Sequence, residues 1–138
     1  MENNILKGDF SLIEKKKIAL MISHSENQNI LKKYLKPEYK VITHNLSQKL
    51  EKGDLIIADE QGLKENKEDI FRIKSSENFL YLPLLLITRI AKEEIPDKYL
   101  EIIDEIIEIP IEQRTFISRI KNLLSIRSLF LSTQIFQK

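Results

Sequence analysis

The sequence contains no cysteine and no tryptophan, and it has only three glycines among 138 residues. Without cysteine, disulfide bonds and thiolate metal sites are excluded. The N-terminus lacks the basic start and the small-residue cleavage site of a signal peptide. The longest apolar run, residues 79–87, contains Pro83 and is well short of the roughly 20 residues that a membrane helix requires. We therefore expect a cytoplasmic protein without membrane contact.

The sequence also lacks an excess of either charge. Lys and Arg total 22 against 21 Asp and Glu, and the two signs are interspersed along the chain. The most basic cluster, residues 15–17, directly precedes an apolar run, which is typical of the solvated start of a strand. Nucleic acid is therefore not an expected partner.

Short apolar runs alternate with segments of helical periodicity. The strand candidates are residues 18–22, 39–43, 55–58, 84–87 and 105–109. The helix candidates are residues 25–35 with Ser25 as cap, 67–74 and 112 onward, with at most short helices at 46–51 and at 91–100, where Pro96 interrupts. This alternation implies parallel strands joined by crossover helices. The predicted class is α/β, a flavodoxin-like three-layer sandwich in which a five-stranded parallel sheet carries helices on both faces.

Polar residues gather where the predicted strands end. In parallel sheets, ligands and chemistry collect beyond the carboxyl ends of the strands. Asp59 ends one buried strand, Thr88 ends the next strand 29 residues later, and Ile109 precedes Pro110 a further 21 residues on. This order and spacing resemble the receiver (CheY-like) domain of two-component response regulators. The resemblance covers roughly residues 16–125, although the stretch before Asp59 is shorter than usual for the family.

The resemblance implies roles for these positions. In the family, the Asp accepts a phosphoryl group, the Thr hydroxyl follows it, a Lys before the Pro pairs with it, and an acidic pair after the first strand holds Mg²⁺. Asp59 and Thr88 match the phospho-acceptor and the switch hydroxyl. Ser23 and His24 stand where the acidic pair is expected, and Ile109 occupies the lysine position. The sequence therefore predicts a degenerate receiver in which durable phosphorylation is disfavoured.

Neighbouring residues leave alternatives open. Arg89 follows Thr88, where the family usually has a small residue. Its guanidinium either pairs with Asp59 and fills the space meant for phosphate, or is solvated on a loop. Glu60 or Glu26 would have to replace the missing Mg²⁺ ligands. We expect no cofactor, with Mg²⁺ required only if Asp59 is phosphorylated.

Other combinations of polar residues are weaker candidates. His24 and His44 are the only histidines, and no third ligand has a recognisable spacing, so we expect no metal site. Asp54 and Asp59 lie at opposite ends of one predicted strand, which separates them too far for a carboxylate pair.

The C-terminal helix has more apolar length than the domain needs. Residues 126–138 include Leu129, Phe130, Leu131, Ile135 and Phe136. We interpret them as a helical extension toward another module that forms a homodimer. The alternative is that the helix folds back onto the domain, beside the N-terminal tail at residues 1–15.

Three functions are compatible with this sequence. The first is a non-enzymatic receiver-like module that works without phosphorylation, through contacts with proteins such as a sensor kinase or an output module. The second is a phosphorylatable receiver that uses Asp59 with an atypical metal site. The third is a flavodoxin-like domain that binds a small molecule.

Overall fold

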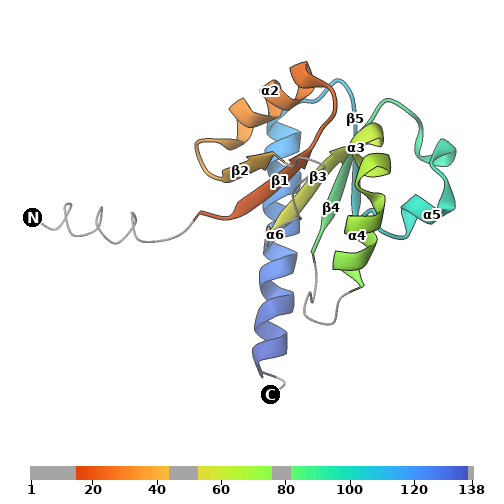
Figure 1. The fold of residues 1–138 in the computed structure, drawn as a ribbon. Helices are drawn as coiled ribbons and strands as arrows, with labels where there is room; N and C mark the ends of the chain where they lie inside the picture. Colours follow the sequence, from red (N-terminus) through yellow and green to blue (C-terminus); the bar gives the residue numbers. More distant parts are fainter. Residues whose placement is uncertain (1–14, 44–52, 76–81, 137–138) are drawn as a thin grey trace, which may run out of the picture.

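The structure, a computed structural model, describes residues 15–43, 53–75 and 82–136. A parallel sheet lies between two layers of helices (Figure 1). The strands are β1 (Lys17–Met21), β2 (Lys40–Thr43), β3 (Leu55–Asp59), β4 (Leu84–Thr88) and β5 (Glu105–Glu108). The helices are α2 (Ser25–Leu35), α3 (Glu60–Glu65), α4 (Lys67–Lys74), the 3-10 helix η1 (Lys92–Glu94), α5 (Asp97–Leu100) and α6 (Gln113–Phe136).

The five described strands run in the order β2-β1-β3-β4-β5, and every pair is parallel. This order confirms the predicted flavodoxin-like sandwich. The pairing places Asp59 of β3 beside Ile87 of β4 and Thr88 beside Glu108 of β5. Because all strands point the same way, the ends of β1, β3, β4 and β5 meet at one edge of the sheet.

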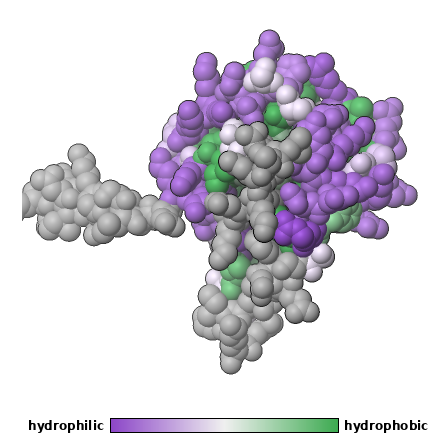
Figure 2. Space-filling view, viewed as in Figure 1, coloured by the Kyte–Doolittle hydropathy of each residue, from purple (hydrophilic) through white to green (hydrophobic). Residues whose placement is uncertain are grey.

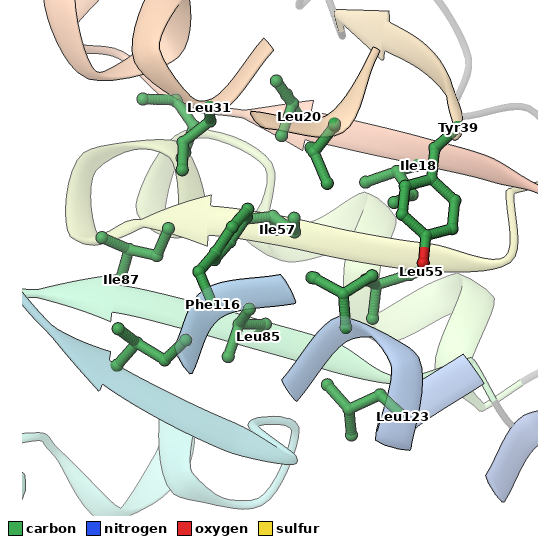
Figure 3. Close-up of a cluster of buried hydrophobic side chains, with 14 of the residues drawn as sticks. Ile18, Leu20, Leu31, Tyr39, Leu55, Ile57, Leu85, Ile87, Phe116 and Leu123 are labelled. Carbon is green, nitrogen blue, oxygen red and sulfur yellow. The ribbon is translucent and has the colours of Figure 1, made fainter. Parts of the chain in front are cut away.

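The sheet is covered on both faces, which explains why β1, β3 and β4 are almost continuously apolar. Helices α2 and α6 cover one face, while α3, α4 and α5 cover the other. Phe116 of α6 is fully buried and lies over the strands among Ile57, Leu85 and Ile87 (Figure 3). Fully burying one such side chain contributes roughly 1.5–3 kcal/mol, so this core fixes α6 on the sheet.

Local structure departs from the sequence prediction at two helix starts. Helix α3 begins directly after Asp59, in a segment for which no helix was predicted. Ser25 is the first residue of α2 rather than its cap, and His24 occupies the cap position without a side-chain capping bond. Pro96 separates η1 from α5, as expected. The predicted helix at 46–51 lies outside the described residues.

Helix α6 is long relative to the domain. Its 24 residues span about 36 Å. Its buried residues end at Leu124, whereas Ile126, Leu129 and Phe130 are among the exposed large apolar residues. The helix continues below the sheet, and its visible lower part carries hydrophobic surface (Figures 1 and 2). No helix within the described ranges is long and apolar enough to cross a membrane.

Candidate functional site

Asp59 lies at the carboxyl end of β3, with a carboxylate that is almost buried. Its Oδ2 accepts hydrogen bonds from the Ser23 N–H at 2.9 Å, the Ser23 hydroxyl at 2.9 Å and the His24 N–H at 3.4 Å. Its Oδ1 accepts from the Gly62 N–H at 2.7 Å. Both oxygens of the carboxylate therefore accept hydrogen bonds from protein groups. Asp59 connects the loop after β1 to the first turn of α3.

Helix α3 starts at this point because Asp59 is its N-cap. The backbone of Asp59 is extended, and aspartate is among the preferred residues for capping the free N–H groups of a first turn. The short side chain reaches the N–H of Gly62 three residues later. The same carboxylate that matches the family's phospho-acceptor position thus has a structural partner inside its own helix.

Gly62 allows α3 to approach β1 unusually closely. A Cβ atom at this position would lie 1.7 Å from the carbonyl oxygen of Met21 and 2.7 Å from its carbonyl carbon. Such distances are far below van der Waals contact, so only glycine fits while the backbone stays in place. The N-terminal turn of α3 consequently covers the carboxyl end of β1, next to Asp59.

Thr88 is fully buried at the end of β4, and its hydroxyl is engaged by Glu60. Thr88 Oγ1 donates to Glu60 Oε1 and accepts a hydrogen bond from the Ile90 N–H at 3.0 Å. Glu60 Oε1 also accepts from the Arg89 N–H at 3.3 Å. Sequence reasoning considered Glu60 as a replacement metal ligand or as one of a group of carboxylates. It missed this contact because no short-range pattern pairs residues 28 positions apart.

The remaining predicted residues are placed as follows. Arg89 is exposed and forms no ion pair with Asp59 in the part of the chain that the structure describes. Ile109 donates its backbone N–H to the Thr88 carbonyl at 3.0 Å, and its side chain packs against the core under α6. His44, the other half of the histidine pair, lies outside the described residues.

The residues at this edge do not fit a magnesium ion. Mg²⁺ needs oxygen lone pairs, usually from one or two carboxylates and waters. Two N–H groups and a hydroxyl point at Asp59 Oδ2, and the Gly62 N–H points at Oδ1. Their positive ends would repel a cation. Within the described residues, no group of three His, Asp or Glu side chains could hold a metal ion, and Glu26 is exposed on the first turn of α2.

The site therefore holds two adjacent carboxylates without a cation partner among the described side chains. Asp59 and Glu60 instead accept hydrogen bonds from backbone N–H groups and hydroxyls. Hydrogen bonds from neutral donors to a carboxylate are stronger than those between two neutral groups. The arrangement connects two loops to α3, and both oxygens of Asp59 already accept hydrogen bonds from protein groups.

Comparison with known proteins relates the fold to solved structures. No protein-family model and no curated protein sequence matches the chain. The signal receiver domain of a signal transduction histidine kinase from Syntrophus aciditrophicus matches with a TM-score of 0.62 and 21% identity, over 80% of this chain and 90% of its own. A response regulator from Thermotoga maritima matches with a TM-score of 0.61 and 16% identity, over 80% and 98%.

A third match is the receiver domain of a sensor histidine kinase from Pseudomonas aeruginosa, whose crystal structure has a magnesium ion in the active site cleft. Its TM-score is 0.62 and its identity 15%, over 80% of this chain and 98% of its own. These matches agree with the five-stranded parallel topology of the sheet. The chain therefore has the fold of a response-regulator receiver domain.

Proposed function

We propose that this chain is a non-enzymatic receiver-like module of a two-component system that works through protein contacts and is not phosphorylated. The single observation that carries the proposal is the Asp59 carboxylate. Its two oxygens accept hydrogen bonds from Ser23, His24 and Gly62, as a helix cap does. Attack on a phosphoryl donor would require one oxygen to give up these partners while the charge on the incoming group stays uncompensated.

Among the described residues, no positively charged side chain pairs with Asp59, which supports the same conclusion. A phosphoryl group adds close to two negative charges, which need a cation or a lysine nearby. Ile109, which is partly buried and packs against the core, stands at the position where the family resemblance implies a lysine. Arg89 is exposed and does not contact Asp59. A phosphorylated Asp59 would thus be placed beside apolar surface and a second carboxylate, Glu60.

A direct test is titration with Mg²⁺ and beryllofluoride, which imitates a phosphoryl group on a carboxylate. We expect the amide NMR signals of Ser23, Asp59 and Thr88 to stay unchanged at millimolar concentrations. A receiver known to be phosphorylated serves as the positive control. Shifts that saturate at these three residues would overturn the proposal and favour a phosphorylatable receiver with an atypical metal site.

We propose that the protein contacts are made by the part of α6 that follows Leu124, and that the partner is a second copy of this chain. Ile126, Leu129 and Phe130 are 49%, 69% and 41% exposed, and residues 128–136 carry no charged side chain. An uncharged apolar helix meets no charge repulsion from its own copy, and pairing two of them removes this surface from water. A homodimer through α6 would place the C-terminal helices of two chains side by side.

Sedimentation equilibrium can test the dimer. We expect self-association near 100 μM for the full chain, on the order of a micromolar dissociation constant for a few buried side chains. Replacing Ile126 and Leu129 with Gln should yield a monomer. Ile30→Gln is the matched control, since Ile30 is 43% exposed but lies on α2. A monomeric wild-type chain, or equal weakening by Ile30→Gln, contradicts the proposed interface.

A further inference from the structure

Glu60 connects the start of α3 to the end of β4 through a single oxygen atom. Glu60 Oε1 accepts from the Thr88 hydroxyl and from the Arg89 N–H, and Thr88 Oγ1 accepts in turn from the Ile90 N–H. The last residue of β4 and the two residues after it are thereby linked to one carboxylate, Thr88 and Arg89 directly and Ile90 through the Thr88 hydroxyl. None of these contacts was expected from the sequence.

The burial of Thr88 makes an acceptor at this point necessary. The residue is 0% exposed, so its hydroxyl proton has no water to bind and would be costly if left alone. An anionic acceptor is favoured over a neutral one because the neighbouring Arg89 N–H points to the same oxygen. The N-terminus of α3, where Glu60 is the first residue, also favours a negative charge there.

We propose that Glu60 is a resident anionic ligand of Thr88, which takes the place of a phosphoryl group and holds the connection after β4 in one arrangement. The inference rests on the proposed function, because a phosphoryl group on Asp59 would compete for the same hydroxyl. The inference goes beyond the proposed lack of phosphorylation because it names Glu60 as an internal ligand of Thr88. On this proposal, the Thr88 hydroxyl stays hydrogen-bonded to Glu60.

Glu60 also forms part of the wall against which the following helices pack. A cavity of about 260 Å³ lies between α3 and the segment of η1 and α5, and its lining includes Glu60, Ile90, Ile95 and Tyr99. Ile95 and Tyr99 are buried in the core on this face. Releasing Glu60 from Thr88 would therefore loosen Ile90 and the connection leading to η1, while the strands stay paired.

Amide hydrogen exchange of Arg89 and Ile90 tests the proposal. Glu60→Ala should speed both amides by about tenfold or more relative to the core amides of β3. The Arg89 N–H loses its charged acceptor, and the Thr88 hydroxyl that accepts from the Ile90 N–H loses the partner that holds it in place. Glu60→Asp is the sharper variant. It keeps the charge at the start of α3 but is one methylene too short to reach Thr88, so it should behave like Glu60→Ala.

Glu65→Ala is the matched control, because it removes an exposed carboxylate from the other end of α3. It should leave Arg89 and Ile90 within about twofold of the wild type, as expected for a surface site. If Arg89 and Ile90 exchange at wild-type rates in Glu60→Asp, their protection would come from the negative charge at the start of α3 and not from the contact between Glu60 and Thr88. That result, or an unchanged Glu60→Ala chain, overturns the proposal.

A double-mutant cycle provides a second readout if Glu60→Ala destabilises all of α3. Thr88→Val keeps the buried volume but removes the hydroxyl. We expect the two substitutions to be coupled by at least about threefold in the unfolding equilibrium constant. Additive effects would contradict the Glu60 proposal even if beryllofluoride fails to bind. Saturating beryllofluoride shifts at Asp59 would instead contradict the proposed function, so the two failures are distinguishable.

Discussion

The two ends of the sheet hold their carboxylates in different ways. At the amino end, Asp54 accepts from the Lys17 N–H at 2.8 Å and pairs with Arg127 of α6 at 3.4 Å. Asp104 accepts from the Leu84 N–H at 2.7 Å and pairs with Lys74 of α4 at 2.7 Å. Each of these carboxylates thus receives one strand amide and one cation. Each of the two carboxylates therefore connects a helix to the start of a strand.

At the carboxyl end, Asp59 and Glu60 receive N–H and O–H donors only, within the residues that the structure describes. Their charges are stabilised by dipoles whose positions depend on the backbone of two loops and α3. The amino end should therefore respond to ionic strength, whereas the carboxyl end should respond to changes of backbone position. Asp59 thus connects the loop after β1 to the first turn of α3.

The largest effect is expected for Gly62→Ala at the carboxyl end. The added Cβ would overlap the Met21 carbonyl at 1.7 Å, so α3 must move away from β1 and Asp59 loses its cap contact. We expect a loss of about 3 kcal/mol or more in unfolding free energy, measured by chemical denaturation.

Gly53→Ala is the matched control at the amino end. Its Cβ would meet no atom nearer than 3.7 Å, which is ordinary contact. The substitution should be neutral or stabilise the fold by up to about 1 kcal/mol. If both alanine variants have the same stability, the close packing of α3 on β1 is not required.

The second prediction concerns the charge on Asp59. In Asp59→Asn, an NH₂ group replaces one oxygen and faces an N–H donor from Gly62 or from Ser23. The chain should still fold, with a loss of about 1–3 kcal/mol in unfolding free energy. Ser23→Ala removes a single hydroxyl bond and should cost less, about 1 kcal/mol. An Asp59→Asn chain as stable as the wild type would mean that the cap contributes little.

The third prediction addresses the ion pair at the amino end. Lys74→Met removes the cation next to Asp104, whose side chain is 24% exposed, and should cost about 1 kcal/mol at low salt. This difference from the wild type should shrink as salt increases, whereas the cost of Asp59→Asn should not. Arg72→Met, which removes an exposed pair with Asp69, is the control and should change stability by less than about 0.5 kcal/mol. Equal salt dependence at both ends would remove the distinction drawn between them.

The smallest effect at neutral pH is expected at Tyr39, which precedes β2 at the amino end. Burial, and then the nearby Glu38 charge, raise the pKa of Tyr39 above its ordinary value of 10.0. The folded state therefore binds the phenol proton more tightly than the unfolded state. Its contribution to stability is fully present below pH 10 and is lost as pH rises through the raised pKa.

Tyr39→Phe should remove this part of the alkaline dependence and leave the neutral-pH stability nearly unchanged. Denaturation followed between pH 9 and roughly 11.5 would measure the difference. Tyr34, on α2, provides the corresponding Tyr→Phe control. A Tyr39→Phe chain with the same alkaline slope as the wild type would show that other groups dominate there.

Sequence reasoning was accurate where a pattern is local. The apolar runs ending at Asp59 and Thr88 are strands, and Lys67–Lys74 is a helix with the predicted limits. It failed for α3, whose six residues carry only one buried leucine and therefore no helical stripe. The signal that could have found it is Asp59 itself, an N-cap residue followed three positions later by a glycine.

The sequence by itself determined the order of the strands and the parallel sheet, and the family resemblance implied that Ser23, His24 and Ile109 stand in place of the acidic pair and the lysine. These follow from residue type and spacing along the chain. Only the tertiary structure decided what the two adjacent carboxylates bind. Asp59 turns to Ser23 and Gly62, while Glu60 turns to Thr88. The physical reason is that hydrogen-bond partners are set by the packing of α3 against β1 and β4, which joins residues up to 36 positions apart.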